Sequence, residues 1–90
     1  MEEKKMIEPK GRMSARYIGK EVGKSAKWVY EMWKDMGIVI KDKYGDWILT
    51  DAGRALNGKM SKFSDFSVPT FKAEEIIPKM EEFFIKHRMK

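Results

Sequence analysis

Residues 14–36 constrain the fold most strongly, because apolar side chains recur there in two helical stripes. The first stripe is Ala15, Ile18, Gly19 and Val22, and the second is Val29, Met32, Trp33 and Met36. Both follow the i, i+3, i+4, i+7 spacing that places side chains on one face of an α-helix. Between them, Gly23 can adopt a left-handed backbone without a Cβ clash, and Ser25 can cap the following helix. The segment therefore predicts two short amphipathic helices joined by a glycine-centred turn.

Capping residues set the expected ends of these helices and predict a third helix. Ser14 is expected to be the N-cap of the first helix, and Gly37 suits the end of the second because it follows the last apolar position. Thr50 is expected to cap a short helix over residues 51–56, in which Asp51 lies near the positive end of the helix dipole.

Two runs of β-branched and aromatic residues, at 38–40 and 47–49, predict a β-hairpin. The residues between them are rich in turn formers, and Gly45 can take a positive φ. An isolated hairpin is only marginally stable, so this one is expected to pack against the helices. Strand alternation predicts that Ile38 and Ile40 share one face. The return strand is expected to cover the core through Trp47 and Leu49.

Residues 57–90 are predicted to form a loop followed by a C-terminal helix. Residues 59–71 have no periodic pattern and are expected to be an ordered loop, anchored by Phe63, Phe66, Val68 and Phe71. The helix is expected to begin near Ile77 or Pro78, since proline is tolerated in a first turn but breaks an established helix. Its apolar residues are Met80, Phe83, Phe84, Ile76 and Ile77. They either pack on the same chain, which is the preferred alternative, or form a dimer interface.

Composition limits the class of protein. Ninety residues suit one small domain, here with a flexible lead-in over residues 1–12. The lack of cysteine excludes a disulfide framework and a thiolate metal site, and favours an intracellular protein. The one histidine, His87, is close to the end of the sequence, and no apolar run resembles a membrane span or a signal peptide. We therefore expect a soluble cytoplasmic protein that is not an enzyme and has no cofactor, metal site or membrane partner.

The order of the predicted elements resembles a known family. The turn segment with Gly19, Gly23 and Val29 resembles the helix-turn-helix of DNA-binding regulators, although Lys24 stands where that family usually has an apolar residue. The hairpin and the segment Leu-Thr-Asp-Ala-Gly-Arg at 49–54 resemble the winged helix-turn-helix proteins, in which such a segment closes the β-wing. The opening S-A-x-x-I-G-x-x-x-G-x-S at residues 14–25 is more distantly similar to small phage regulators, including the C-terminal domains of antirepressor proteins. The resemblance covers residues 13–56. It implies an α+β, mainly helical fold: a winged helix-turn-helix with an added C-terminal helix.

The resemblance also implies a function: a small, transcription-regulatory protein that places residues 25–34 in the major groove of double-stranded DNA. The residues that it assigns to nucleic acid are Arg16, Lys20, Ser25, Ala26, Lys27, Tyr30, Glu31, Lys34 and Lys43. Lysine can donate to guanine or phosphate oxygens, and glutamate can accept a hydrogen bond from cytosine. The formal net charge of +5 fits a polyanionic partner.

Two features keep a second function open. Glu31 repels phosphate, and it stands at i+4 from Lys27, where an intrahelical ion pair is expected. Trp28, on a shoulder of the helix, is either a core residue or an exposed aromatic anchor for a protein partner. The alternative is a protein–protein interaction module in which Trp28, Tyr30 and Glu31 form a contact patch and DNA is not bound. A homodimer is compatible with either function.

Overall fold

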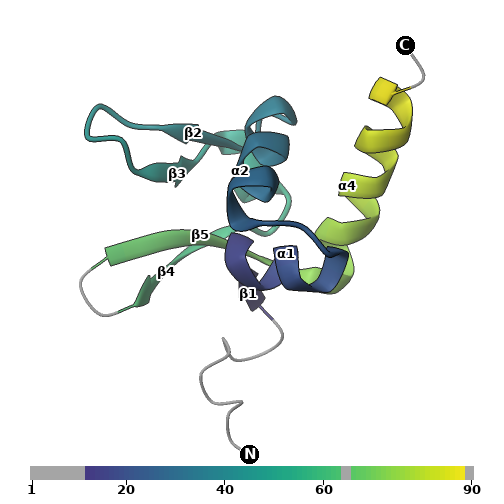
Figure 1. Ribbon diagram of the computed structural model, residues 1–90. Coiled ribbons are helices and arrows are strands. Elements are labelled where there is room, and N and C mark those ends of the chain that lie inside the picture. The colour runs from purple at the N-terminus through teal and green to yellow at the C-terminus, as the bar shows by residue number, and fades with distance from the viewer. Residues whose placement is uncertain (1–11, 64–65, 89–90) are drawn as a thin grey trace, which may run out of the picture.

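The structure is a computed structural model that describes residues 12–63 and 66–88. Within these ranges the chain forms four helices and five strands, arranged as in Figure 1. Their order is β1 (Arg12–Ser14), α1 (Ala15–Val22), α2 (Ala26–Asp35), β2 (Val39–Lys41), β3 (Trp47–Leu49), α3 (Asp51–Ala55), β4 (Lys59–Phe63), β5 (Phe66–Lys72) and α4 (Ala73–Arg88). The predicted α+β class is therefore confirmed. The predicted lead-in over residues 1–12 lies outside the described residues, apart from Arg12, which begins β1.

Helices α1 and α2 form the expected pair around a tight turn. Gly23 has a left-handed backbone, with φ at 75°. A Cβ atom on Gly19 would lie 2.5 Å from the carbonyl oxygen of Lys24, so a glycine there lets the turn close against α1. The Ser25 hydroxyl accepts a hydrogen bond from the Trp28 N–H at 3.1 Å and caps α2 as predicted. Ser14 is the N-cap residue of α1, but its side chain makes no capping hydrogen bond.

Strands β2 and β3 form the predicted hairpin, with Val39 opposite Leu49 and both side chains buried. The expected shared face of Ile38 and Ile40 is wrong. Ile38 is 3% exposed, whereas Ile40 is 51% exposed. Ile38 precedes the first residue of β2, so the strand alternation begins at Val39 and turns Ile40 to the outside.

Thr50 joins the end of α2 to the start of α3. Its hydroxyl accepts a hydrogen bond from the Gly53 N–H at 3.1 Å, which confirms the predicted cap. The same hydroxyl donates to the carbonyl of Gly37 at 2.7 Å. Gly53 is buried, and a Cβ atom there would collide with the carbonyl oxygen of Ile38. Helix α3 therefore docks against the end of α2 through backbone contact.

A three-stranded antiparallel sheet, in the order β1-β5-β4, occupies the region predicted as a loop. Arg12 pairs with Lys72 at one edge of β5, and Lys59 pairs with Thr70 at the other. The prediction of a loop over residues 59–71 is therefore wrong. Pro69 argued against a central strand, because proline cannot donate a ladder hydrogen bond. In the structure the pairing of β1 stops at Thr70, so Pro69 lies where β5 has β4 as its neighbour but not β1.

Helix α4 begins at Ala73, earlier than the predicted start near Ile77 or Pro78, and Pro78 lies inside it. Ile76 and Met80 lie one turn apart on α4 and are 1% and 3% exposed. Their burial stabilises the first turns, which offsets the backbone hydrogen bond that proline cannot donate. These two side chains pack on the same chain, whereas Phe84, which was expected to share this apolar face, is 44% exposed. Ile85, in the other half, is 57% exposed.

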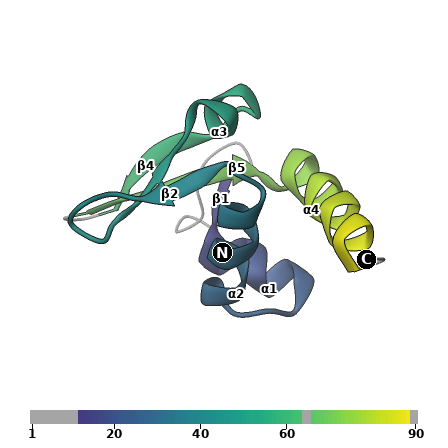
Figure 2. The same ribbon diagram turned by 90° about the horizontal axis from the view of Figure 1, so that it is seen from above.

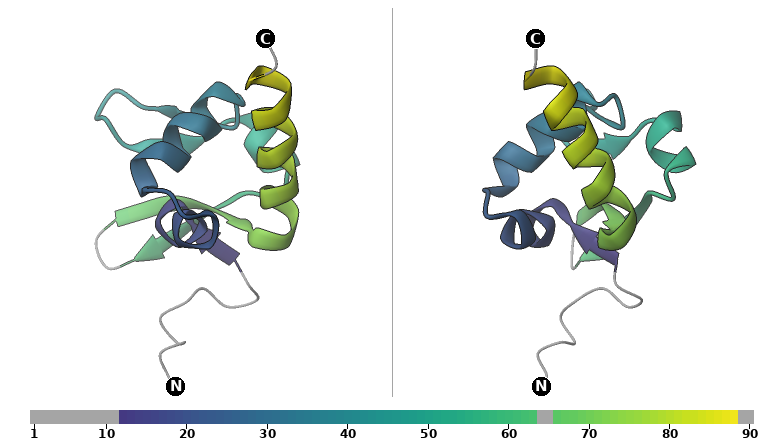
Figure 3. Two further views of the ribbon diagram at one scale, coloured as in Figure 1. Left: turned by 45° about the vertical axis from the view of Figure 1, so that its right-hand side comes forward. Right: turned by 90° about the vertical axis from the view of Figure 1, so that its right-hand side faces the viewer.

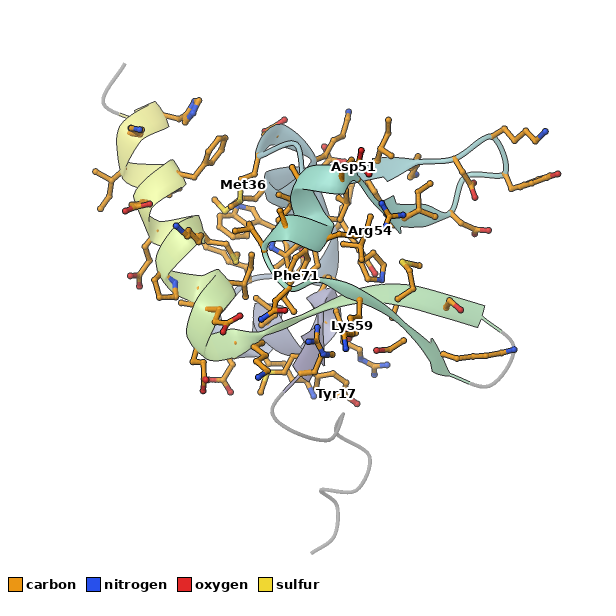
Figure 4. The ribbon with its side chains drawn as sticks, turned by 180° about the vertical axis from the view of Figure 1, so that it is seen from behind. Tyr17, Met36, Asp51, Arg54, Lys59 and Phe71 are labelled. Carbon is orange, nitrogen blue, oxygen red and sulfur yellow. The ribbon has the colours of Figure 1, made fainter. Side chains whose placement is uncertain are left out.

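The core lies where the helices meet the two sheets. Seen from above, α1 and α2 lie on one side of the two β-hairpins and α3 lies on the other (Figure 2). Helix α4 lies at the end of the molecule opposite the hairpin tips. Trp33 of α2 and Phe71 of β5 are both fully buried, and their rings meet edge to face with centroids 4.8 Å apart. Figure 4 shows Phe71 in the interior, between α4 and the strands. This contact anchors α2 to the central strand.

Candidate nucleic-acid interface

Helix α2 has one buried face and one polar outward face. Val29, Met32 and Trp33 are buried, whereas Lys27 and Lys34 are exposed. The predicted apolar face of this helix is therefore confirmed at these three positions, while Met36, the fourth, is half-buried. Neither lysine takes part in an ion pair within the described residues, so both ammonium groups remain free to meet an anion. The two lysines are seven positions apart in the sequence, which corresponds to about 10 Å along the helix axis.

The start of α2 and the exposed side of α1 contribute further predicted residues. Ser25 is exposed with its hydroxyl engaged in the cap, and Ala26 is half-buried against the core. Arg16 and Lys20 are exposed one turn apart on α1. The Lys20 ammonium lies 5.6 Å from the centroid of the Tyr17 ring. This arrangement leaves both α1 cations at the surface.

Tyr30 lies on the shoulder of α2 that faces the β2–β3 hairpin. Its ring stacks on Trp47 of β3, with centroids 5.0 Å apart and planes 4° from parallel. It also meets Trp33 edge to face at 5.9 Å. Burial raises the pKa of the Tyr30 phenol above its ordinary value of 10.0. The side chain is therefore a neutral hydrogen-bond donor near pH 7, held between α2 and the hairpin.

Glu31 is exposed on the shoulder of α2 that faces α4. The intrahelical ion pair expected between Glu31 and Lys27 is not among the ion pairs of the described residues. Instead, Glu31 and Asp35 both line a hollow between α2 and α4. The negative charge of α2 therefore lies on the α4 side, away from the shoulder that carries Tyr30.

The tip of the β2–β3 hairpin is shaped by Asp42. Its carboxylate accepts hydrogen bonds from the backbone N–H groups of Tyr44, at 2.8 Å, and Asp46, at 3.0 Å. Gly45 completes the tip with φ at 85°. Lys43 is exposed there, with its ammonium 5.5 Å from the centroid of the Tyr44 ring, and Tyr44 is 78% exposed. Lys43 is therefore an exposed positive charge at the tip of the hairpin, with the carboxylates of Asp42 and Asp46 close to it in sequence.

Trp28 is half-buried on the shoulder of α2 next to α4. Its ring lies 6.4 Å from the Phe84 ring, centroid to centroid, and the planes make an angle of 53°. The Lys24 ammonium lies 5.2 Å from the Trp28 ring centroid. Of the two alternatives for Trp28, packing on the core is supported by its contact with the buried cluster.

Sequence reasoning missed two residues at these positions. Trp47 was expected only to cover the core, yet it also holds Tyr30 against the hairpin. Asp35 received no role, although it lies one turn after Glu31 on the same shoulder. The spacing of Glu31 and Asp35 was a usable signal, but their common environment depends on α4, which the sequence did not place.

Other kinds of site find no support in the described part of the chain. Its side chains contain no group of three or more His, Asp or Glu suited to a metal ion. None of its helices combines the length and apolar character required to cross a membrane.

No protein-family model, curated protein or solved structure matches this chain. The physical arrangement of its side chains therefore carries the functional argument.

Proposed function

We propose that this chain is a small winged helix-turn-helix protein, similar to phage regulators, that binds double-stranded DNA and regulates transcription in the cytoplasm. One observation carries the proposal: Lys27 and Lys34 are exposed, without an ion-pair partner among the described residues, on the outward face of the helix that follows the glycine turn. A helix with this presentation fits the width of the major groove of B-form DNA.

The two lysines of α2 suit a groove contact by their spacing. About 10 Å along the helix separates them, so one can meet a base edge or phosphate near the start of α2 and the other a phosphate near its end. Ser25 and Ala26, at the N-terminal end, add a short side chain and a small apolar surface that fits against a base edge. Arg16 and Lys20 of α1 supply charge for the adjacent phosphate backbone.

The β2–β3 hairpin is the proposed wing. It projects on the side of the molecule opposite α4 (Figure 1), and its tip carries the exposed Lys43. The Tyr30–Trp47 stack joins the base of the hairpin to α2. Helix and wing therefore form one surface of fixed shape, which reduces the ordering cost of binding.

The acidic shoulder of α2 gives the complex an orientation. Glu31 and Asp35 repel phosphate, and both lie toward α4. In the proposed complex the duplex crosses α2 and the hairpin, while α4 and the acidic shoulder face away. Glu31 is then at the margin of the interface and not a central base-reading residue.

The alternative of a protein-interaction module receives less support. It requires Trp28, Tyr30 and Glu31 to form one patch. Trp28 and Glu31 lie toward α4, whereas Tyr30 stacks on Trp47 at the hairpin. The three side chains therefore do not form a single contact surface, and DNA is the better supported partner.

A fluorescence anisotropy titration with a mixed-sequence duplex at low salt tests the proposal. Binding is expected at micromolar protein, with log K falling linearly against log salt because counterions are released from phosphates. Five or six phosphate contacts would give a slope of about −5. Absence of binding at micromolar protein would contradict the proposed function.

A further inference from the structure

Helices α2 and α4 border an open hollow of about 340 Å³ on the side of α2 away from the hairpin. The two helices lie next to each other in both views of Figure 3. The volume falls in the range of about 300–1,000 Å³ that is usual for small-molecule sites. The residues that line the hollow are Trp28, Glu31, Met32, Asp35, Phe83, Phe84 and His87. The proposed DNA interface does not use this hollow.

Aromatic rings form much of the wall. Phe83 stacks with His87 at a centroid distance of 3.9 Å and an angle of 29°, and Trp28 contacts Phe84 at 6.4 Å. The Lys24 ammonium already lies 5.2 Å from the Trp28 ring centroid, on the side of a neighbouring hollow. The aromatic wall therefore suits the apolar body of a ligand, and its charge must be met elsewhere on the rim.

Two carboxylates on α2 border the same hollow. Glu31 and Asp35 are one helical turn apart, and neither forms an ion pair within the described residues. Like charges at this spacing repel each other and destabilise a helix. A cation placed between them removes the repulsion and neutralises the rim. An anion placed there is repelled by both carboxylates.

We propose that this hollow binds a small lipophilic organic cation of the arylalkylammonium class. The aryl group packs against Trp28, Phe83 and Phe84, and the ammonium group lies between Glu31 and Asp35. The charge complementarity of the two carboxylates selects the cation, and the aromatic wall selects the apolar body. The site stands independently of DNA binding.

The position of the site gives it a regulatory consequence that rests on the proposed function. The carboxylates that the ligand neutralises belong to the helix that also carries Lys27 and Lys34. Neutralisation lowers the repulsion between α2 and phosphate, so the ligand strengthens DNA binding. By linkage, DNA strengthens ligand binding by the same factor.

Isothermal titration calorimetry of the full chain without DNA tests the site directly. The probes are benzyltrimethylammonium as the cation and phenylmethanesulfonate as an anion of similar size. The cation is expected to bind at least about tenfold more tightly than the anion. Equal binding of the two probes, or no measurable binding of the cation at millimolar concentration, would overturn the proposal.

Paired variants locate the binding. Glu31→Gln with Asp35→Asn keeps the shape of the rim and removes its charge, and is expected to weaken cation binding at least about tenfold. Glu21→Gln with Glu74→Gln removes the same charge from exposed positions that do not line the hollow and is expected to leave the affinity unchanged. Equal affinities for the two double variants would show that the cation binds elsewhere. A cation that binds without altering DNA affinity would leave the site intact and refute only its regulatory role.

Discussion

Tyr30 of α2 and Trp47 of β3 stack with their ring planes 4° from parallel and their centroids 5.0 Å apart. The Lys41 ammonium lies 5.1 Å from the Trp47 ring centroid, and Trp33 meets Tyr30 edge to face. The hairpin thus continues the aromatic core of α2. This relationship determines how the proposed wing is oriented relative to the proposed recognition helix.

A double-mutant cycle measures the strength of this stack. Tyr30→Leu and Trp47→Leu are each expected to destabilise the domain, and the double variant less than their sum, with a coupling energy of about 0.5–1.5 kcal/mol. Urea unfolding provides the free energies. Tyr17→Leu with Trp47→Leu is the control, because no ring contact joins Tyr17 and Trp47 in the structure. Additivity in the Tyr30 cycle would show that the stack does not couple helix and hairpin.

The partly buried phenol of Tyr30 gives stability a dependence on alkaline pH. Well below pH 10.0 the phenol is protonated in both the folded and the unfolded chain, so it adds no pH dependence. As pH rises through 10.0 the unfolded chain releases the proton first, because burial raises the pKa in the folded state. The free energy of unfolding is therefore expected to fall above pH 10.0. Tyr30→Phe should reduce this fall in urea unfolding experiments, and an identical pH profile for the two proteins would argue against a buried phenol.

Gly19 and Gly23 have different roles in the turn, and substitutions separate them. Gly19→Ala brings a Cβ atom to 2.5 Å from the backbone of Lys24 and is expected to cost about 2–3 kcal/mol of stability. Gly23→Ala meets no atom within 4 Å and pays only for its left-handed φ, about 1 kcal/mol. Chemical denaturation measures the loss of stability in each variant and shows which loss is larger. A larger loss for Gly23→Ala would contradict the close approach of the turn to α1.

The elements predicted correctly are those with local signals. Stripe spacing, the Ser25 and Thr50 caps and the Gly45 turn each act over a few residues, and they locate α1, α2, the first hairpin and α3. The sheet of β1, β5 and β4 depends instead on pairing Arg12 with Lys72, far apart in the sequence. Pro69 made β5 harder still to predict. A proline is tolerated there because the pairing with β1 ends at Thr70, and that end point is not visible in the sequence.

The start of α4 was predicted incorrectly for a related reason, and one substitution tests the correction. Pro78 is exposed inside α4, where it removes a backbone hydrogen bond. Pro78→Ala is therefore expected to raise the free energy of unfolding by about 1–3 kcal/mol and the helical circular dichroism signal with it. A helix that began at Pro78 would gain almost nothing, so an unchanged stability would favour the later start.

The candidate interface was predicted more fully than its surroundings. Period 3.6 alone separates Lys27 and Lys34 from Val29 and Trp33, so the outward face of α2 followed from the sequence. The residues that flank the two shoulders of α2 could not be predicted in this way, because they belong to β3 and α4. Glu31 illustrates the difference: it was assigned to the candidate interface from the sequence, but the hollow that it shares with Asp35 was not predicted.

DNA affinity of two matched double variants tests the central claim most directly. Lys27→Ala with Lys34→Ala removes the charges of the proposed recognition helix, and Lys79→Ala with Lys86→Ala removes two exposed lysines of α4 at the same seven-residue spacing. In anisotropy titrations over a range of salt, the α2 variant is expected to bind at least about tenfold more weakly, with a salt slope smaller by about two. The α4 variant should bind within about twofold of the parent chain. Equal losses in the two variants, or an α2 variant that binds as tightly as the parent, would contradict DNA recognition by α2.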